Sequence, residues 1–156
     1  MPRVLRLALA AWFAVAAGSL PAQADLGPII ARYGNWEVHR YIDKMTDKVQ
    51  CIATYRGRTN VQLTNYNLMI KTVGTPRSFR YRLNDEPASG MITTSELARG
   101  IGTIEIAGAL FDRLVHAARL RVQVLTYRFV QKYELREFDL DLNGIYSAYG
   151  AVYHCR

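Results

Sequence analysis

The sequence predicts a mainly β fold, an antiparallel β-sandwich or barrel-like single domain with one or two short helices. Three observations lead to this prediction. Short runs of alternating apolar and polar residues recur along the chain, separated by turn-forming residues. A helical spacing of apolar residues replaces the alternation in only two places. No long linker, low-complexity run or internal repeat divides the chain, and roughly six to eight short strands in about 130 residues are typical of such a domain.

A hairpin is predicted near the start of this domain. Residues 36–41 (WEVHRY) and 49–56 both alternate with a period of two, and the polar segment 43–48 between them has the composition of a turn. Cys51 falls on the more apolar face of the second strand. That position is suited to a buried disulfide sulfur.

The middle of the chain continues in strands. The alternation in 61–73 changes phase near Thr64, which predicts a bulge or a break between two strands. A further run ending at Leu83 is the clearest amphipathic strand, because its aromatic and arginine residues alternate without interruption. Additional strands are expected at 91–94, 102–107 and 120–124.

The two helical patterns lie later in the sequence. Residues 108–120 (GALFDRLVHAARL) predict an amphipathic helix of about three turns, whose apolar side belongs to the core or, alternatively, docks a partner or a membrane. A strand over 133–142 follows, with a slip in its hydrophobic pattern at Arg136-Glu137. The segment 142–155 then predicts a short helix that Cys155 pins to the domain.

The first 24 residues have the layout of a secretory signal peptide. Two arginines precede an apolar stretch, and Ala22-Gln23-Ala24 supplies small residues at the positions that signal peptidase requires. The stretch is shorter than a comfortable membrane span, and no stable transmembrane anchor is expected. We therefore expect cleavage after Ala24, a single domain at 25–156, and a periplasmic or secreted protein of the bacterial envelope.

The charge is moderately basic. The sequence carries +7, of which Arg3 and Arg6 contribute two in the predicted signal peptide, leaving +5 for the domain. In an exported protein, an anionic envelope polymer or an envelope protein is a more plausible partner than nucleic acid, which we do not expect. The alternative is that these charges only keep the domain soluble.

The two cysteines predict one disulfide. Cys51 and Cys155 make an even count in an oxidising compartment. Redox-active pairs usually lie close in sequence, and this pair does not. A structural bond that closes a long loop is therefore favoured over a redox site or a metal site.

The sequence offers no convincing catalytic or metal-binding constellation. The serines of the domain stand outside nucleophile motifs, and its histidines (His39, His116 and His154) are scattered. Asp139 and Asp141 lie on the same side of a predicted strand, where paired carboxylates could cleave a glycan or simply form a solvated face. We predict no catalytic residues, no metal and no cofactor.

Arginines and tyrosines are the residues best suited to binding. Arginine forks suit carboxylates and phosphates, and tyrosine rings offer flat stacking surfaces. Among the strand arginines, Arg80, Arg82 and Arg121 are the predicted binding residues.

Several segments resemble known families of exported bacterial proteins. YGNWEV, the turn IDKMTD and the following Cys51 resemble the opening of invasion-associated locus B proteins. RYRLNDEP, the segment from Phe111 to Ala118 and the closing FDLDLNGIYSAYGAVYHC look like periplasmic accessory proteins of type VI secretion. Both resemblances imply a β-rich periplasmic domain that binds or assists, without a catalytic motif.

The functional prediction is therefore a non-enzymatic exported protein that binds or assists another component of the cell envelope. Two alternatives remain. One is an envelope glycan or peptidoglycan hydrolase that uses Asp139 and Asp141, and the other is a small exported enzyme inhibitor. The oligomeric state is not predicted.

Overall fold

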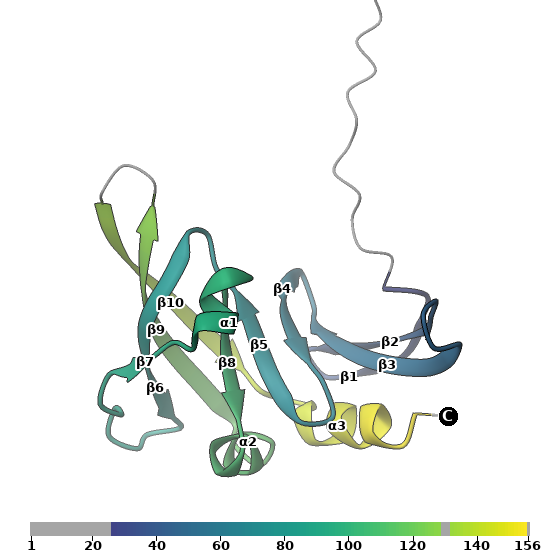
Figure 1. Cartoon of the computed structure of the whole chain (residues 1–156). Helices are drawn as coiled ribbons and strands as arrows, with labels where there is room; N and C mark the ends of the chain where they lie inside the picture. Colours follow the sequence, from purple (N-terminus) through teal and green to yellow (C-terminus); the bar gives the residue numbers. More distant parts are fainter. Residues whose placement is uncertain (1–25, 129–131, 156) are drawn as a thin grey trace, which may run out of the picture.

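The computed structural model describes residues 26–128 and 132–155, which form two antiparallel sheets and three short helices (Figure 1). The predicted signal peptide lies outside the described residues. The first sheet has the strand order β1-β2-β3-β4-β5-β8 and the second has the order β10-β9-β6-β7. Within the described part of the chain, the elements are β1 Ile29–Tyr33, β2 Trp36–Asp43, β3 Lys48–Tyr55, β4 Arg58–Leu63, β5 Asn67–Lys71, β6 Thr75–Leu83, β7 Ile92–Thr93, α1 Glu96–Gly100, β8 Thr103–Ala107, α2 Ala109–Leu114, β9 Arg119–Arg128, β10 Lys132–Asp141 and α3 Ile145–Tyr153.

Both sheets contribute to one hydrophobic core. Strand alternation buries Val38, Leu68 and Ile70 from the first sheet and Leu120 and Val122 from the second. Every one of these side chains is at most 1% exposed. The sandwich class predicted from the alternation is therefore confirmed, and the fold is two packed sheets.

The predicted first hairpin is confirmed. β2 and β3 pair without a break in register, so that Val38 lies opposite Ala53 and Arg40 lies opposite Cys51. In the turn, the side chain of Asp43 accepts a hydrogen bond from the Met45 amide at 2.9 Å. This backbone hydrogen bond lowers the pKa of Asp43 from its ordinary value.

The phase change near Thr64 is a break between two strands. β4 ends at Leu63 and β5 begins at Asn67, with the Thr64 hydroxyl accepting a hydrogen bond from the Asn67 amide at 3.2 Å. This local side-chain bond offers the backbone an alternative to the sheet ladder. The chain can then turn back, and Leu68 pairs with Leu63.

Two elements escaped the sequence reasoning, and one predicted helix is shorter than expected. β1 and α1 were not predicted. The helix expected over 108–120 is limited to Ala109–Leu114 because the Asn84 side chain accepts hydrogen bonds from the amides of Ala118 and Arg119 at 2.8 and 3.1 Å. Those bonds hold the chain at the start of β9. The apolar residues that extended the helical pattern belong to the turn and the core.

The slip predicted at Arg136-Glu137 is not a bulge. β10 pairs with β9 over its whole length without a register shift. The hydrophobic pattern changes because the strand changes surroundings: Leu140 is fully buried, whereas Tyr133 and Leu135, on the opposite face of the sheet, are 60% and 56% exposed. Toward the start of the strand, the face that carries Leu140 bears the charged residues Lys132, Glu134 and Arg136.

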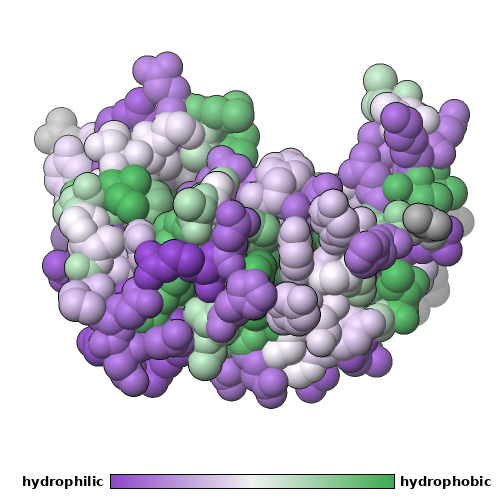
Figure 2. All heavy atoms as spheres, turned by 90° about the horizontal axis from the view of Figure 1, so that it is seen from below, coloured by the Kyte–Doolittle hydropathy of each residue, from purple (hydrophilic) through white to green (hydrophobic). Residues whose placement is uncertain are grey.

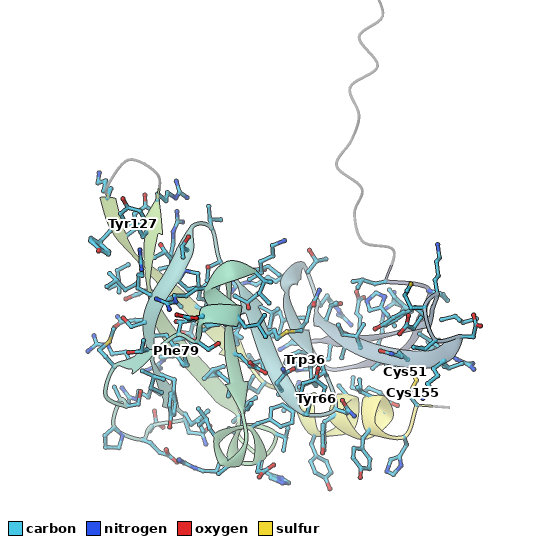
Figure 3. All side chains as sticks on the ribbon, viewed as in Figure 1. Trp36, Cys51, Tyr66, Phe79, Tyr127 and Cys155 are labelled. Carbon is cyan, nitrogen blue, oxygen red and sulfur yellow. A yellow bond between two sulfur atoms is a disulfide. The ribbon has the colours of Figure 1, made fainter. Side chains whose placement is uncertain are left out.

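The C-terminal helix is confirmed and is bonded to the first sheet. α3 packs beneath β2 and β3 (Figure 1). Cys155 forms a disulfide with Cys51 of β3, with their Cα atoms 5.8 Å apart (Figure 3). The predicted pairing of the two cysteines is therefore confirmed.

The lower face of the molecule is mainly polar. Figure 2 shows apolar residues scattered among hydrophilic ones and a notch between two lobes. Over the stretches that the structure describes, no helix has the length and apolarity to cross a membrane.

Candidate functional site

The three predicted binding arginines lie together on the outer face of the second sheet. Arg80 and Arg82 are two residues apart in β6, so both side chains leave the face opposite to the buried Phe79 and Leu83. Arg121 of β9 lies directly across from Arg82 in the strand register. Strand alternation therefore collects the guanidinium groups on one surface.

These arginines line a pocket of about 300 Å³. Its wall crosses three strands and reaches the loop that follows β6 at Ala88. The arginines share it with polar and carboxylate side chains of β9 and β10. The full lining consists of Arg80, Tyr81, Arg82, Ala88, Arg121, Val122, Gln123, Glu137, Phe138 and Asp139.

A hydrogen-bonded row organises one side of this arginine pocket. Arg80 Nε donates to the Gln123 side-chain oxygen at 2.5 Å, and the Gln123 amide nitrogen donates to Glu137. The row joins β6, β9 and β10. It fixes Arg80 in place, and among the described residues the terminal nitrogens of Arg80 form no ion pair with a carboxylate.

Arg82 is more weakly paired. Its nearest acidic partner is Asp85, at 3.8 Å, and Asp85 is almost completely exposed. Among the described residues, Arg82 Nε is shielded from solvent and has no hydrogen-bond partner. A buried donor of this kind is costly unless something accepts from it.

Asp139 forms the strongest ion pair beside the pocket. Arg119 Nε donates to its carboxylate at 2.7 Å, and a second guanidinium nitrogen donates to the other oxygen. Arg121 lies 3.7 Å from the same carboxylate. The Arg119 hydrogen bond is the main reason that the pKa of Asp139 lies below its ordinary value. The same bond raises the pKa of Arg119.

The paired carboxylates occupy different roles. Asp139 is held by arginines, whereas Asp141 accepts a hydrogen bond from the Asn143 amide at 3.0 Å. A general acid for glycoside cleavage needs a raised pKa, and the pKa of Asp139 moves the other way. Asp139 thus forms an ion pair, and Asp141 accepts a hydrogen bond in the turn that follows β10.

The histidines are dispersed in the described chain. His39 contacts the Gly27 carbonyl and the Thr54 hydroxyl at 3.2 and 3.0 Å. His116 and His154 instead lie beside the rings of Tyr146 and Tyr153. No group of three potential metal-ligating side chains occurs within residues 26–128 and 132–155.

The sequence predicted the three arginines as binding residues, which stays a prediction, but it did not indicate their neighbours. The hydrogen bond between Gln123 and Glu137 depends on pairing between β9 and β10. The ion pair of Arg119 with Asp139 depends on the same pairing. These contacts depend on the register between the two strands, and the alternation of residues within one strand does not specify that register. The alternation of charge with apolar residues in both strands was the available signal.

The fold and the arginine pocket define a class: a disulfide-bonded two-sheet β domain with an arginine-lined pocket on its second sheet. Among solved structures, it is similar to invasion associated protein B from Bartonella henselae, with a TM-score of 0.50 and 15% sequence identity. The match covers 78% of this chain and 94% of that protein. At this identity the similarity concerns the fold. No family model and no curated protein sequence matches the chain.

Proposed function

We propose that this protein is an exported, non-enzymatic envelope protein that binds an anionic component of the bacterial envelope through the arginine pocket. The Cys51–Cys155 disulfide supports an oxidising compartment. The fold similarity to invasion associated protein B supports a place among locus B-like proteins. The resemblance to type VI secretion accessory proteins stays a hypothesis about its pathway.

The opposition of Arg82 and Arg121 is the observation that carries this proposal. Like charges directly across a sheet destabilise it, and here the two arginines face one another, with their carboxylate partners at 3.8 and 3.7 Å, beyond hydrogen-bond distance. A phosphate or carboxylate group between them would remove the repulsion. Its oxygens would also accept hydrogen bonds from the terminal guanidinium nitrogens of Arg82 and Arg121.

A binding titration tests this proposal. Lipopolysaccharide is the probe, with a dephosphorylated form as its matched comparison, and calorimetry gives the dissociation constant. We expect binding to lipopolysaccharide that weakens with salt, and a loss of roughly tenfold or more in each of Arg82→Ala and Arg121→Ala. Arg99→Ala, which removes the same charge from α1 outside the pocket lining, is the control.

Two results would contradict the proposal. Equal affinity in the Arg82→Ala and Arg99→Ala proteins would remove the pocket from the interaction. An absence of binding to lipopolysaccharide, to other anionic envelope polymers and to envelope proteins at low salt would remove the function. The hydrolase and inhibitor alternatives are checked in the same preparation by peptidoglycan turnover and by inhibition of lysozymes.

A further inference from the structure

β10 forms the edge of the second sheet. It is ten residues long, and β9 is the described strand that pairs with it. Among the described elements, β9 is also the one against which β10 packs extensively. A long edge strand presents a row of unpaired backbone donors and acceptors, which can pair with another strand.

The hydrogen-bond pattern identifies the backbone groups that face this open edge. The Leu142 amide donates to the Ala118 carbonyl at 2.8 Å, continuing the β9–β10 ladder. Because inward and outward groups alternate in an antiparallel strand, the even-numbered residues of β10 face β9. The amides and carbonyls of Tyr133, Leu135 and Glu137 therefore face outward.

An apolar cluster leads to the same edge. Tyr133 lies opposite Tyr127 and Leu135 lies opposite Leu125, all on the outer face of the sheet. The Tyr127 and Tyr133 rings have centroids 5.5 Å apart. Figure 3 places Tyr127 close to the projecting end of the β9–β10 hairpin. Both members on β10 are more than half exposed, so the cluster is incomplete on the side where another strand would lie.

The charges on the inner face are also incomplete at this edge. Glu134 lies 2.7 Å from Arg136 and 3.5 Å from Arg128. In the described chain, Nε of both arginines is shielded from solvent without a hydrogen-bond partner. One carboxylate thus serves two guanidinium groups, and Arg136 can pair with a further carboxylate across the edge.

A second copy of β10 supplies a strand for the open edge and an opposite charge across from both Glu134 and Arg136. In an antiparallel pair related by a two-fold axis at Leu135, each Leu135 faces the other, and Tyr133 faces Glu137 of the second copy. On the inner face, Glu134 then faces Arg136 in both directions. Registers centred on Glu134, Arg136 or Glu137 instead oppose that charge to itself, which is destabilising. Charge complementarity therefore disfavours these three registers and favours the one centred on Leu135, which opposes Glu134 to Arg136 twice.

We propose that the protein forms a symmetric dimer in which β10 of one copy pairs with β10 of another, centred on Leu135. The two four-stranded sheets become one continuous sheet. The opposed backbone groups of Leu135 exchange hydrogen bonds, and each Glu134 accepts from Arg136 of the second copy. This seven-residue pairing spans residues 132–138 and shares Glu137 and Phe138 with the lining of the arginine pocket, whereas the three pocket arginines lie outside it.

Charge exchange tests the dimer and its register. Sedimentation of the exported protein is expected to give twice the mass of one chain. Glu134→Arg and Arg136→Glu should each lose the dimer because like charges then face one another. An equimolar mixture should regain it, since every facing pair in the mixed dimer has opposite signs. Far-ultraviolet circular dichroism confirms that each variant is folded.

A crosslink provides the second measurement. Directly opposed residues in hydrogen-bonded antiparallel positions have Cα atoms about 5.5 Å apart, within the range for a disulfide. Leu135→Cys is therefore expected to give a covalent dimer on a non-reducing gel, and Tyr133→Cys, which faces Glu137, is expected to give much less. The native disulfide is unchanged in both proteins.

The outcomes separate this dimer from other arrangements. A monomer at all concentrations together with no Leu135→Cys crosslink overturns the proposal. A dimer that survives each charge variant, or one that crosslinks equally through Tyr133→Cys, overturns the pairing. Loss of the dimer in the single variants and recovery in the mixture supports it, whether or not the arginine pocket binds an anion.

Discussion

At the scale of single residues, Asp139 shows how a charge on a strand surface can support the fold. Its carboxylate accepts two hydrogen bonds from Arg119 and lies near Arg121. Since Asp139 is half exposed, solvent and salt screen the interaction. The ion pair nevertheless lowers the pKa of this carboxyl group, and that makes its contribution measurable.

The Asp139→Asn variant is expected to lose stability at neutral pH but not in acid. Because the pKa of Asp139 is lowered in the folded state, its ionised carboxylate stabilises the fold at pH values above the ordinary pKa of 3.8. This stabilisation is lost as the pH falls through the folded-state pKa. Urea unfolding from pH 7 to pH 2 measures this as a gap between wild type and variant that closes below pH 3.8. A gap that widens in acid would contradict the assignment, and added salt should narrow the gap at pH 7.

At the scale of elements, the start of α3 fits against the β1–β2 turn through Gly34 and Gly144. Gly144 has φ +86°, and a Cβ built there would lie 2.1 Å from the Tyr33 carbonyl oxygen. Asn35 connects the same turn to the end of β10: its amide donates to the Asn143 carbonyl, and its side chain donates to the Asp141 carbonyl at 3.1 Å. This junction joins the two sheets to the helix.

Gly144→Ala is expected to destabilise the protein by about 3 kcal/mol or more, since it combines a positive φ with a backbone clash. Gly57→Ala is the matched control. Gly57 also has a positive φ, +73°, but no neighbouring atom lies within 4 Å of an added Cβ. The Gly57→Ala variant should therefore lose only about 1–2 kcal/mol of unfolding free energy. Chemical denaturation of both proteins gives the comparison, and equal losses would show that the clash is relieved.

Elements with regular alternation were the predictable part of this fold. The hairpin at Trp36, the strand ending at Leu83 and the break after Leu63 follow from local pattern because one face of each strand is buried. α2 was overestimated because a distant side chain, Asn84, ends it. The unpredicted exposure of Leu135 has a similar cause, since a strand at the edge of a sheet can leave the core while its pairing continues.

At the scale of the whole molecule, the disulfide closes most of the domain into a loop. It joins positions 104 residues apart and attaches α3 to β3. Cross-linking of distant residues stabilises chiefly by restricting the unfolded chain, and models give about 4–5 kcal/mol for a loop of this length, with measured values often smaller. The arginine pocket lies on the other sheet and receives this support through the shared core.

Replacing Cys51 and Cys155 together by alanine is expected to cost about 2–5 kcal/mol of unfolding free energy. Urea titrations of the variant and of the oxidised wild type measure the loss. Reduced and alkylated wild type should resemble the variant, which separates the bond from the side chains themselves. An unchanged unfolding midpoint would mean that the sheets and α3 hold together equally well without the bond.

The position of this bond also sets an order of events in biogenesis. Cys51 belongs to an early hairpin, whereas its partner follows the last helix. The native partner of the Cys51 thiol is therefore made only after α3, so this bond can form only late in the synthesis of the domain. Only a chain that includes α3 and Cys155 can form the bond, so the disulfide marks molecules in which the two sheets and this helix are all present.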